Sequence, residues 1–307
     1  MLVNPLIVIV GPTAVGKTAI SLDLAQKLGG EVVSADSRQV YRGMDIGTAK
    51  ATPAEQMLVL QHLLDIRNLD ETLSLGEYQK LAYAIIDDIH GREQLPFLVG
   101  GTGQYVRAVV EGWQVPEVPP QVELRSALEE QAQRQGKEAV FARLQELDPF
   151  SAERIDWRNL RRVIRAIEVT TVLGRPFSEL QTKSPPPYSL VQIGLTRPRE
   201  LLYQRADARI EQMFTDGFVQ EVEQLLAADY IPDLPSFSSL GYREIAGYLA
   251  GQYDLEEAKI LLRRHTRQFI RRQYNWFRLS DPSITWFDLE EQTAGDVLTF
   301  FGKAVDQ

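Results

Sequence analysis

The sequence of 307 residues contains no cysteine and only three histidines. A chain without thiols cannot form disulfides, thiolate zinc sites or iron–sulfur clusters, and it has no cysteine nucleophile. No apolar run approaches the roughly 20 residues that a helix needs to cross a bilayer. We therefore expect a soluble, cytoplasmic protein that folds in a reducing compartment and has no membrane partner.

Basic residues are scarce, since 33 Lys and Arg against 42 Asp and Glu give a formal net charge of −9. This balance argues against a nucleic-acid partner, because phosphate binding normally requires an excess of cations. Residues 259–279 depart from it, because they contain no Asp or Glu. They carry Lys259, Arg263, Arg264, Arg267, Arg271, Arg272 and Arg278. The sequence therefore predicts a local basic face on an acidic protein.

A helix over this basic region would separate its side chains into two faces. The apolar face, which we expect to pack on the core, carries Leu262, Phe269, Trp276 and Phe277. The basic face, which would be free to follow a phosphate backbone, carries Arg263, Arg264, Arg267 and Arg271. Arg272 projects from another side of the helix.

Short apolar runs alternate with helical patterns in the rest of the chain. We expect strands over residues 6–10, 31–34, 96–99 and 191–195, and a helix over residues 18–28. This alternation predicts an α/β fold with a parallel sheet covered by helices. Ligands of such sheets bind at the edge where the strands end. Asp36, Arg197 and the turn at residues 100–102 should converge at this edge.

Two proline clusters, at residues 116–120 and 185–187, bracket a stretch without convincing strands. Helical patterns within it cover residues 121–135, 137–147 and 160–173. Because prolines end helices and stiffen joints, we expect a helical insertion domain over 116–187, hinged on a core of residues 1–115 and 188–307. After Pro198 the pattern is helical almost to Ser280.

The strongest motif follows the first predicted strand and matches G-x-x-x-x-G-K-[ST], a phosphate-binding loop (P-loop). It consists of Gly11, Pro12, Thr13, Ala14, Val15, Gly16, Lys17 and Thr18. Glycines let the amides curl around an anion, lysine adds a charge, and the threonine hydroxyl can bind Mg²⁺. No predicted strand is a clean apolar run ending in an acid, as triphosphatases require. The loop therefore predicts a diphosphate or polyphosphate ligand without requiring ATP.

Further motifs occur in one order along the chain. They are residues 36–50 (DSRQVYRGMDIGTAK), 62–66 (HLLDI), 100–103 (GGTG), 161–169 (RRVIRAIEV), 216–218 (DGF), 240–244 (LGYRE) and 266–278, from Thr266-Arg267-Gln268 to Trp276-Phe277-Arg278. Together with the P-loop, they resemble the tRNA dimethylallyltransferase family, also called tRNA isopentenyltransferase, in its bacterial form. The resemblance covers nearly the full length.

This resemblance implies a P-loop nucleotide-kinase-like parallel sheet core with an all-helical insertion domain, pierced by a channel. Dimethylallyl diphosphate would enter one end, and the adenosine immediately 3′ of a tRNA anticodon would be flipped into the other. The partners would be this diphosphate and the tRNA anticodon stem-loop, with Mg²⁺ as cofactor and the protein acting as a monomer.

The resemblance also implies roles for single residues. Asp36 would accept the proton of the adenosine amine as general base. Thr13 would lie near the breaking carbon–oxygen bond, and Arg209 would stabilise the leaving diphosphate with the loop amides, Lys17 and Mg²⁺ on Thr18. By their positions alone, Asp36 could equally be a helix cap and Arg209 a solvated charge on a helix face.

The residues implied to contact tRNA lie in four segments of the chain. They are Asp36, Ser37, Arg38, Gln39 and Thr102; Arg125, Arg161, Arg162, Val163, Ile164 and Arg165; Gly241, Tyr242 and Arg243; and Arg271, Arg272, Gln273, Trp276 and Arg278. The charged members could equally form solvated helix faces.

Three other functions remain open from the sequence. A P-loop small-molecule kinase or ATPase would use the same loop, and an adenylate isopentenyltransferase would prenylate a free adenine nucleotide. A nucleotide-gated RNA-binding module would leave the RNA unmodified.

Overall fold

The computed structural model describes residues 3–305, with the side chains of residues 303–305 left aside. The chain divides into two compact units. The core unit comprises Met1–Val110 and Pro187–Gln307, and the insertion unit comprises Glu111–Pro186. The first junction falls at residue 110, ahead of the boundary at 115 expected from the proline cluster.

The core unit contains a six-stranded parallel sheet in the order β3-β2-β4-β1-β5-β6. Its strands are β1 (Pro5–Val10), β2 (Gly30–Ser34), β3 (Gln61–His62), β4 (Leu95–Gly100), β5 (Ser189–Thr196) and β6 (Thr285–Asp288). The four predicted strands and their parallel arrangement are confirmed. The two edge strands were missed, because β3 pairs over only two residues and β6 is four residues long. None of the four predicted strands ends in an acid, as expected, whereas the edge strand β6 ends in Asp288.

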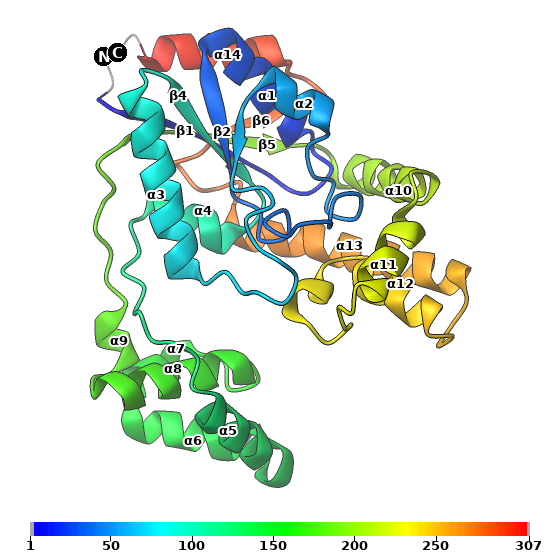
Figure 1. The fold of residues 1–307 in the computed structure, drawn as a ribbon. Coiled ribbons are helices and arrows are strands. Elements are labelled where there is room, and N and C mark those ends of the chain that lie inside the picture. The colour runs from blue at the N-terminus through cyan, green and yellow to red at the C-terminus, as the bar shows by residue number, and fades with distance from the viewer. Residues whose placement is uncertain (1–2, 306–307) are drawn as a thin grey trace. The chain divides into compact units, whose positions relative to one another are not determined.

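Helices cover both faces of the sheet, so alternate side chains of each central strand enter different cores (Figure 1). Ile7 and Ile9 of β1 pack with α1 (Lys17–Leu28) and α14 (Ala294–Val305). Leu6 and Val8 pack with α3 (Leu75–Gly91) and α4 (Gly103–Val110). Burial on both sides explains why β1 is a continuous apolar run.

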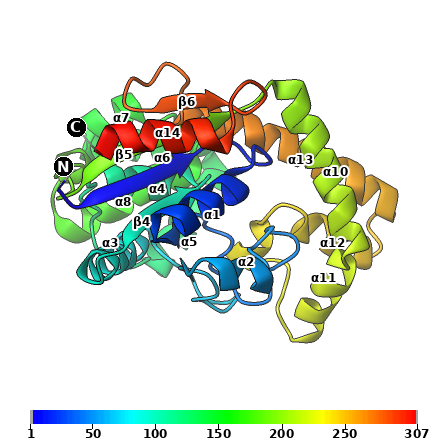
Figure 2. The same cartoon turned by 90° about the horizontal axis from the view of Figure 1, so that it is seen from above.

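Four helices of the second half gather beside the edge where the strands end (Figure 2). They are α10 (Arg199–Thr215), α11 (Phe218–Ala227), α12 (Tyr242–Leu249) and α13 (Leu255–Trp276), with a 3₁₀ turn, η1 (Pro235–Ser238), before α12. Together with the segment at residues 40–50 they enclose a third core around Met44, Phe218, Phe237 and Tyr242. The helical pattern predicted after Pro198 is confirmed. The short helix α2 (Pro53–Leu58) follows this segment and begins with a capping box on Thr52.

The insertion unit is a small helical bundle. It comprises α5 (Val122–Gln135), α6 (Lys137–Leu147), α7 (Pro149–Arg154), α8 (Leu160–Leu173) and α9 (Phe177–Leu180). Its ends run antiparallel, with a bridge between Trp113 and Lys183. Its core contains Val163 and Ile164, which are 0% and 4% exposed. Both side chains belong to this core, and the predicted tRNA contact of these residues stays a prediction. Within residues 3–305, no helix is long and apolar enough to span a bilayer.

Candidate functional site

The P-loop occupies the turn between β1 and α1, at the edge where the parallel strands end. Gly11 and Gly16 have φ of 147° and 114°, a region that favours glycine, and Ala14 is also left-handed with φ of 68°. A Cβ on Gly11 would lie 2.5 Å from the Leu195 carbonyl oxygen of β5. The amides of Lys17 and Thr18 lie in the first turn of α1, where helical N–H groups have no partner within the helix. This loop is built to hold an anion.

Three cationic side chains engage the carbonyl groups of the loop. The Lys17 ammonium donates to the Gly11 and Pro12 oxygens, both at 3.0 Å. Arg205 donates through Nε to the Ala14 oxygen at 2.9 Å, and Arg197 to the Val15 oxygen at 3.1 Å. The predicted convergence of Arg197 on this edge is confirmed. These side chains satisfy the loop carbonyls, while the amides of Thr13 and Val15 donate to acceptors within the protein.

Charged groups from three different elements lie close enough to affect the pKa values of Lys17 and Arg209. Burial lowers the pKa of Lys17 to about 8, the Asp36 carboxylate opposes this shift, and the Arg209 guanidinium adds to it. Burial also lowers the pKa of Arg209, again against Asp36. Arg209 Nε is buried and makes no hydrogen bond within residues 3–305. A buried donor of this kind suits an anionic ligand. The structure thus brings Asp36, Lys17 and Arg209 together.

Asp36 follows β2 and is half-buried. Its Oδ1 accepts the Arg38 amide at 2.8 Å, whereas Oδ2 makes no hydrogen bond to any part of the chain that the structure describes. The next residue, Ser37, donates its amide to the Thr102 hydroxyl at 3.0 Å, and the Thr102 amide donates to the Ala35 oxygen. The ends of β2 and β4 are thereby joined, as expected. Asp36 caps no helix; its hydrogen bond to the Arg38 amide belongs to the turn after β2, occupies one oxygen and leaves the other for a substrate.

Gln273 on α13 supports the edge where the strands end through two hydrogen bonds. It is 3% exposed, its Oε1 accepts the Thr13 amide at 2.8 Å, and its Nε2 donates to the Gly101 oxygen at 3.2 Å. A Cβ on Gly101 would lie 2.3 Å from this Nε2, so the glycine allows the approach. Both polar ends of Gln273 are therefore used inside the core, and its predicted tRNA contact stays a prediction. Nothing in the sequence pattern distinguished it from its exposed neighbours.

The basic face predicted on α13 is divided. Arg263 pairs with Glu211 and Arg267 with Asp207, both acids of α10, and Arg271 reaches the Tyr203 hydroxyl at 3.4 Å. The expectation that the Arg263 and Arg267 side is free is therefore wrong. Within residues 259–279, the exposed basic side chains without a partner among the described residues are Arg264, Arg272 and Arg278. Arg264 and Arg272 lie on α13, and Arg278 follows the end of this helix at Trp276.

Tyr242 and Gly241, predicted to contact tRNA, are buried in the third core. Tyr242 is 0% exposed and donates its hydroxyl to Glu221 at 2.6 Å. Arg243, the next residue, is exposed without a recorded partner. Trp276 packs its ring against Gly103, where a Cβ would lie 2.1 Å from the indole. The predicted tRNA contact of Tyr242 and Gly241 stays a prediction; Tyr242 begins α12, and Gly241 precedes it as the N-cap.

In the insertion unit, a fully buried carboxylate takes up two of the predicted RNA-binding arginines. Glu168 is 0% exposed and accepts hydrogen bonds from Arg125 at 2.7 and 2.8 Å and from Arg165 at 2.6 Å. Burial alone would raise the pKa of Glu168, but Arg125, the Gln121 amide and Arg165 together lower it to about 2. Arg125 and Arg165 therefore hold the bundle together, and their expected RNA contact stays a prediction.

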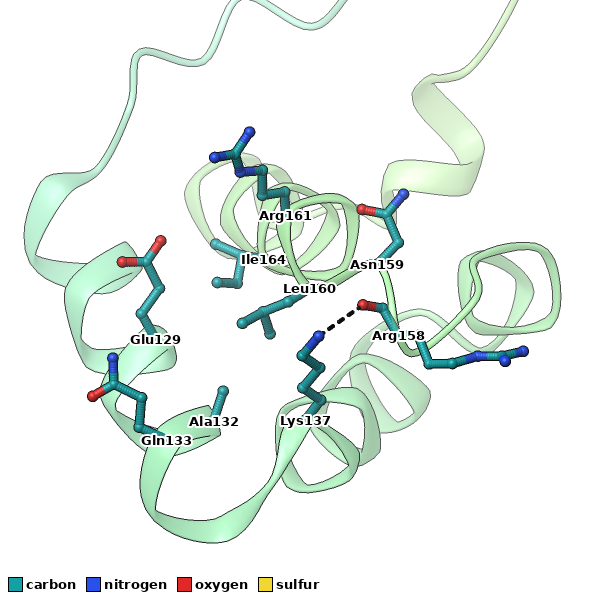
Figure 3. A pocket seen from close by; sticks show the side chains of 9 residues that line it. All are labelled: Glu129, Ala132, Gln133, Lys137, Arg158, Asn159, Leu160, Arg161 and Ile164. Carbon is teal, nitrogen blue, oxygen red and sulfur yellow. Dashed lines mark hydrogen bonds between the residues drawn. The ribbon is translucent and has the colours of Figure 1, made fainter. Parts of the chain in front are cut away.

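The insertion unit also carries an open cleft of about 510 Å³ between α5, α6 and the start of α8 (Figure 3). Arg161 and Glu129 lie on its rim, Leu160 and Ile164 on its floor, and Lys137 donates to the Arg158 carbonyl at 3.3 Å. Arg161 and Arg162 are exposed, as RNA-binding residues would have to be.

Few side chains among the described residues are placed to bind a metal ion. Residues 3–305 contain no group of three His, Asp or Glu side chains placed to hold an ion. The Thr18 hydroxyl is exposed at the start of α1 and has no hydrogen-bond partner in the part of the chain described. This fits Mg²⁺, which binds through one or two protein oxygens and takes its other ligands from phosphate and water.

The parallel sheet, the phosphate loop after β1 and the acid after β2 define the class: a P-loop α/β protein whose ligands meet at the strand ends. The IPP transferase family model matches residues 39–280. A tRNA dimethylallyltransferase from Roseiflexus sp. (strain RS-1) is 54% identical over 294 residues, covering 94% of this chain and 96% of the relative. One from Dehalococcoides mccartyi is 45% identical, covering 96% and 90%. The chain belongs to the tRNA dimethylallyltransferase (IPP transferase) family.

Comparison with solved structures agrees with this family assignment. The full-length tRNA isopentenylpyrophosphate transferase of Bacillus halodurans is 40% identical, with a TM-score of 0.74 and coverage of 99% of this chain and 97% of that one. A eukaryotic dimethylallyltransferase solved while acting on tRNA is 27% identical, with a TM-score of 0.79 and coverage of 92% and 73%. The family resemblance and the α/β P-loop fold expected from the sequence are both confirmed.

Proposed function

We propose that this chain transfers the dimethylallyl group of dimethylallyl diphosphate to the 6-amino nitrogen of the adenosine 3′ to a tRNA anticodon. The products are N6-dimethylallyladenosine and diphosphate. One observation carries the proposal: Asp36, which has one carboxylate oxygen without a hydrogen bond, lies close to two cations, Lys17 and Arg209, beside the phosphate-binding loop. Relatives of the family are named for this reaction.

The reaction breaks the bond between the allylic carbon and the diphosphate oxygen, and the bonding electrons leave with that oxygen. The adenine nitrogen forms the new carbon–nitrogen bond and loses one proton. The loop amides, Lys17 and Arg209 stabilise the developing charge on the leaving diphosphate. The free oxygen of Asp36 takes the proton, and Thr13, held by Gln273, lies beside the breaking bond. The Thr18 hydroxyl would hold Mg²⁺, which would neutralise further charge on the diphosphate.

The tRNA contacts fall on the surfaces that remain exposed and unpaired. On the core unit these are Arg264 and Arg272 of α13, Arg278 just after it, and the exposed Arg243. On the insertion unit they are Arg161 and Arg162. Such contacts neutralise phosphates and position the RNA, while the Asp36 segment contacts the base. The protein works on tRNA in the cytoplasm, as a monomer.

The test is to incubate the full chain with dimethylallyl diphosphate, Mg²⁺ and unmodified tRNA, and to search the digested RNA for prenylated adenosine by mass spectrometry. A product on the anticodon-adjacent adenosine supports the proposal. Prenylation of free AMP with none of tRNA would favour an adenylate isopentenyltransferase, and ATP hydrolysis without prenyl transfer would favour a kinase or ATPase. Lys17→Ala should weaken pyrophosphate binding and leave tRNA affinity nearly intact, because the loop holds only the small substrate.

A further inference from the structure

Only the first four residues of the motif at 36–50 approach the P-loop edge, yet the motif continues for eleven more. The later residues meet Glu221, an acid on α11. Glu221 Oε2 accepts the amides of Asp45 and Ile46 at 3.0 and 2.7 Å, and Oε1 accepts the Gly47 amide at 3.3 Å. The hydroxyl of Tyr242 donates to Oε1 at 2.6 Å. The four donors occupy the acceptor capacity of the carboxylate.

Two aromatic side chains close this contact. A Cβ on Gly47 would lie 2.2 Å from the Phe218 ring and 2.5 Å from that of Tyr242, so the loop backbone lies directly on both rings. The rings themselves meet edge to face, with centroids 5.0 Å apart. Three separate sequence motifs, at residues 36–50, 216–218 and 240–244, therefore converge in one place. None of them contributes a reactive group there.

The same loop is held from its other end by Lys50, which is 9% exposed. Its ammonium donates to the Tyr41 oxygen at 2.8 Å and to the carboxylates of Asp65, at 2.6 Å, and Asp45. Ala49 and Asp65 have φ of 49° and 55°, a conformation that costs energy for residues other than glycine. Such backbone persists only where the surrounding contacts hold it.

A direct chain of contacts leads from this loop to Asp36. Gln39 donates through Nε2 to the oxygens of Thr48 and Ala49, at 3.3 and 3.2 Å, and accepts the Ser34 hydroxyl at 3.2 Å. Ser34 ends β2, two residues before Asp36. The turn that carries Asp36 is therefore held between the strand and the loop that Glu221 fixes.

We propose that Glu221 is a positioning residue for the Asp36 segment: it fixes the backbone of residues 45–47, and through Gln39 and Lys50 that backbone sets the place of Asp36. The inference rests on the proposed prenyl transfer. Glu221 contacts neither the P-loop nor any group assigned to the diphosphate. Its loss should therefore slow the RNA-dependent chemistry and spare diphosphate binding.

The variant Glu221→Gln tests this, because an amide presents N–H groups to backbone donors where an acceptor is needed. We expect the single-turnover rate of prenyl transfer to fall about tenfold to hundredfold, the size expected for a small displacement of a reacting group. Affinity for inorganic pyrophosphate with Mg²⁺, measured by titration calorimetry, should stay within about twofold of wild type, because Glu221 does not contact the P-loop. A tenfold change in affinity would correspond to about 1.36 kcal/mol. Amide hydrogen exchange should rise over residues 36–50.

Glu223→Gln is the matched control, since Glu223 lies exposed on the same helix without a recorded partner and should match wild type in all three measurements. A wild-type rate in Glu221→Gln, or a parallel loss of rate and pyrophosphate affinity, would overturn the inference. If that variant does not fold, Tyr242→Phe removes one of the four donors; a rate about threefold to tenfold lower supports the inference, and an unchanged rate refutes it. Should wild type itself form no prenylated adenosine, the proposed function fails, while the exchange comparison still decides whether Glu221 holds the segment.

Discussion

The two units use arginine in opposite ways. In the insertion unit, Arg125 and Arg165 surround the fully buried Glu168, so that their charges stabilise the bundle. In the core unit, Arg209 has a buried Nε without a partner and faces the strand-end site with Lys17. A satisfied buried ion pair contributes to structure, whereas an unsatisfied buried donor indicates a ligand. The pairing of each guanidinium, more than its place in a basic motif, separates structural from functional arginines.

Asp36→Asn should give the largest effect, and it should change chemistry without changing stability. Asparagine keeps the size of the side chain but cannot take a proton, so single-turnover prenyl transfer should fall by roughly 100-fold to 10,000-fold. Rapid-quench kinetics measure the rate, and filter binding measures tRNA affinity alongside it. An equal loss in both would assign Asp36 to base recognition, because an amide can present a donor to the adenine amine. A full rate would remove Asp36 from either role.

Glu168→Gln should give the opposite result: a loss of stability of about 3 kcal/mol, near the lower end of the range for breaking a buried pair, because both arginines retain partial solvent access. The pKa of Glu168 is lowered to about 2, so the carboxylate stabilises the fold fully above its ordinary pKa of 4.5. That contribution is lost as the pH falls from 4.5 through 2. Urea unfolding of wild type and variant should differ most at pH 7 and progressively less toward pH 2. A difference that does not depend on pH would contradict this assignment.

Gln273→Met should have an intermediate effect, because methionine fills the same volume without the two hydrogen bonds to Thr13 and Gly101. We expect a decrease in kcat of about tenfold, consistent with a misplaced group near the reacting atoms. Binding of tRNA, measured by filter binding, should hardly change, since Gln273 is buried. Weaker tRNA binding with normal kcat would restore the RNA contact that the sequence predicted.

The smallest effect concerns the difference between the unpaired and the paired arginines of residues 259–279. Replacing Arg264, Arg272 and Arg278 together by Ala should weaken tRNA binding and lower the slope of log affinity against log salt by about 2 to 3, since each lost phosphate contact removes about 0.7 to 0.9. The double variant Arg263→Ala with Arg267→Ala removes charges that are paired with α10 and should leave the slope nearly unchanged. Equal slopes in both variants would mean that pairing does not decide which arginines contact RNA.

The sequence predicted the central strands, the P-loop and the helical insertion well. Apolar strands buried on both faces, glycine spacing and proline clusters are local signals that survive into the fold. It failed at the edge strands, where β3 pairs over two residues. It also did not show which polar side chains turn inward, as Gln273 and Tyr242 do. Their polar partners lie on elements distant in the sequence, such as Glu221 for Tyr242, and no local pattern announces them.

By itself the sequence determined the chemistry that is available: a loop that binds phosphate, an acid after the second strand, and arginines on two helices. The tertiary structure decided which of these groups are free to act. Parallel strands brought Asp36, Lys17 and Arg209 to one edge, and the packing of α10 against α13 neutralised Arg263 and Arg267 while leaving Arg264, Arg272 and Arg278 exposed. The physical reason is that a charge is available for function only when no partner in the folded chain has already satisfied it, and such partners come from anywhere in the sequence.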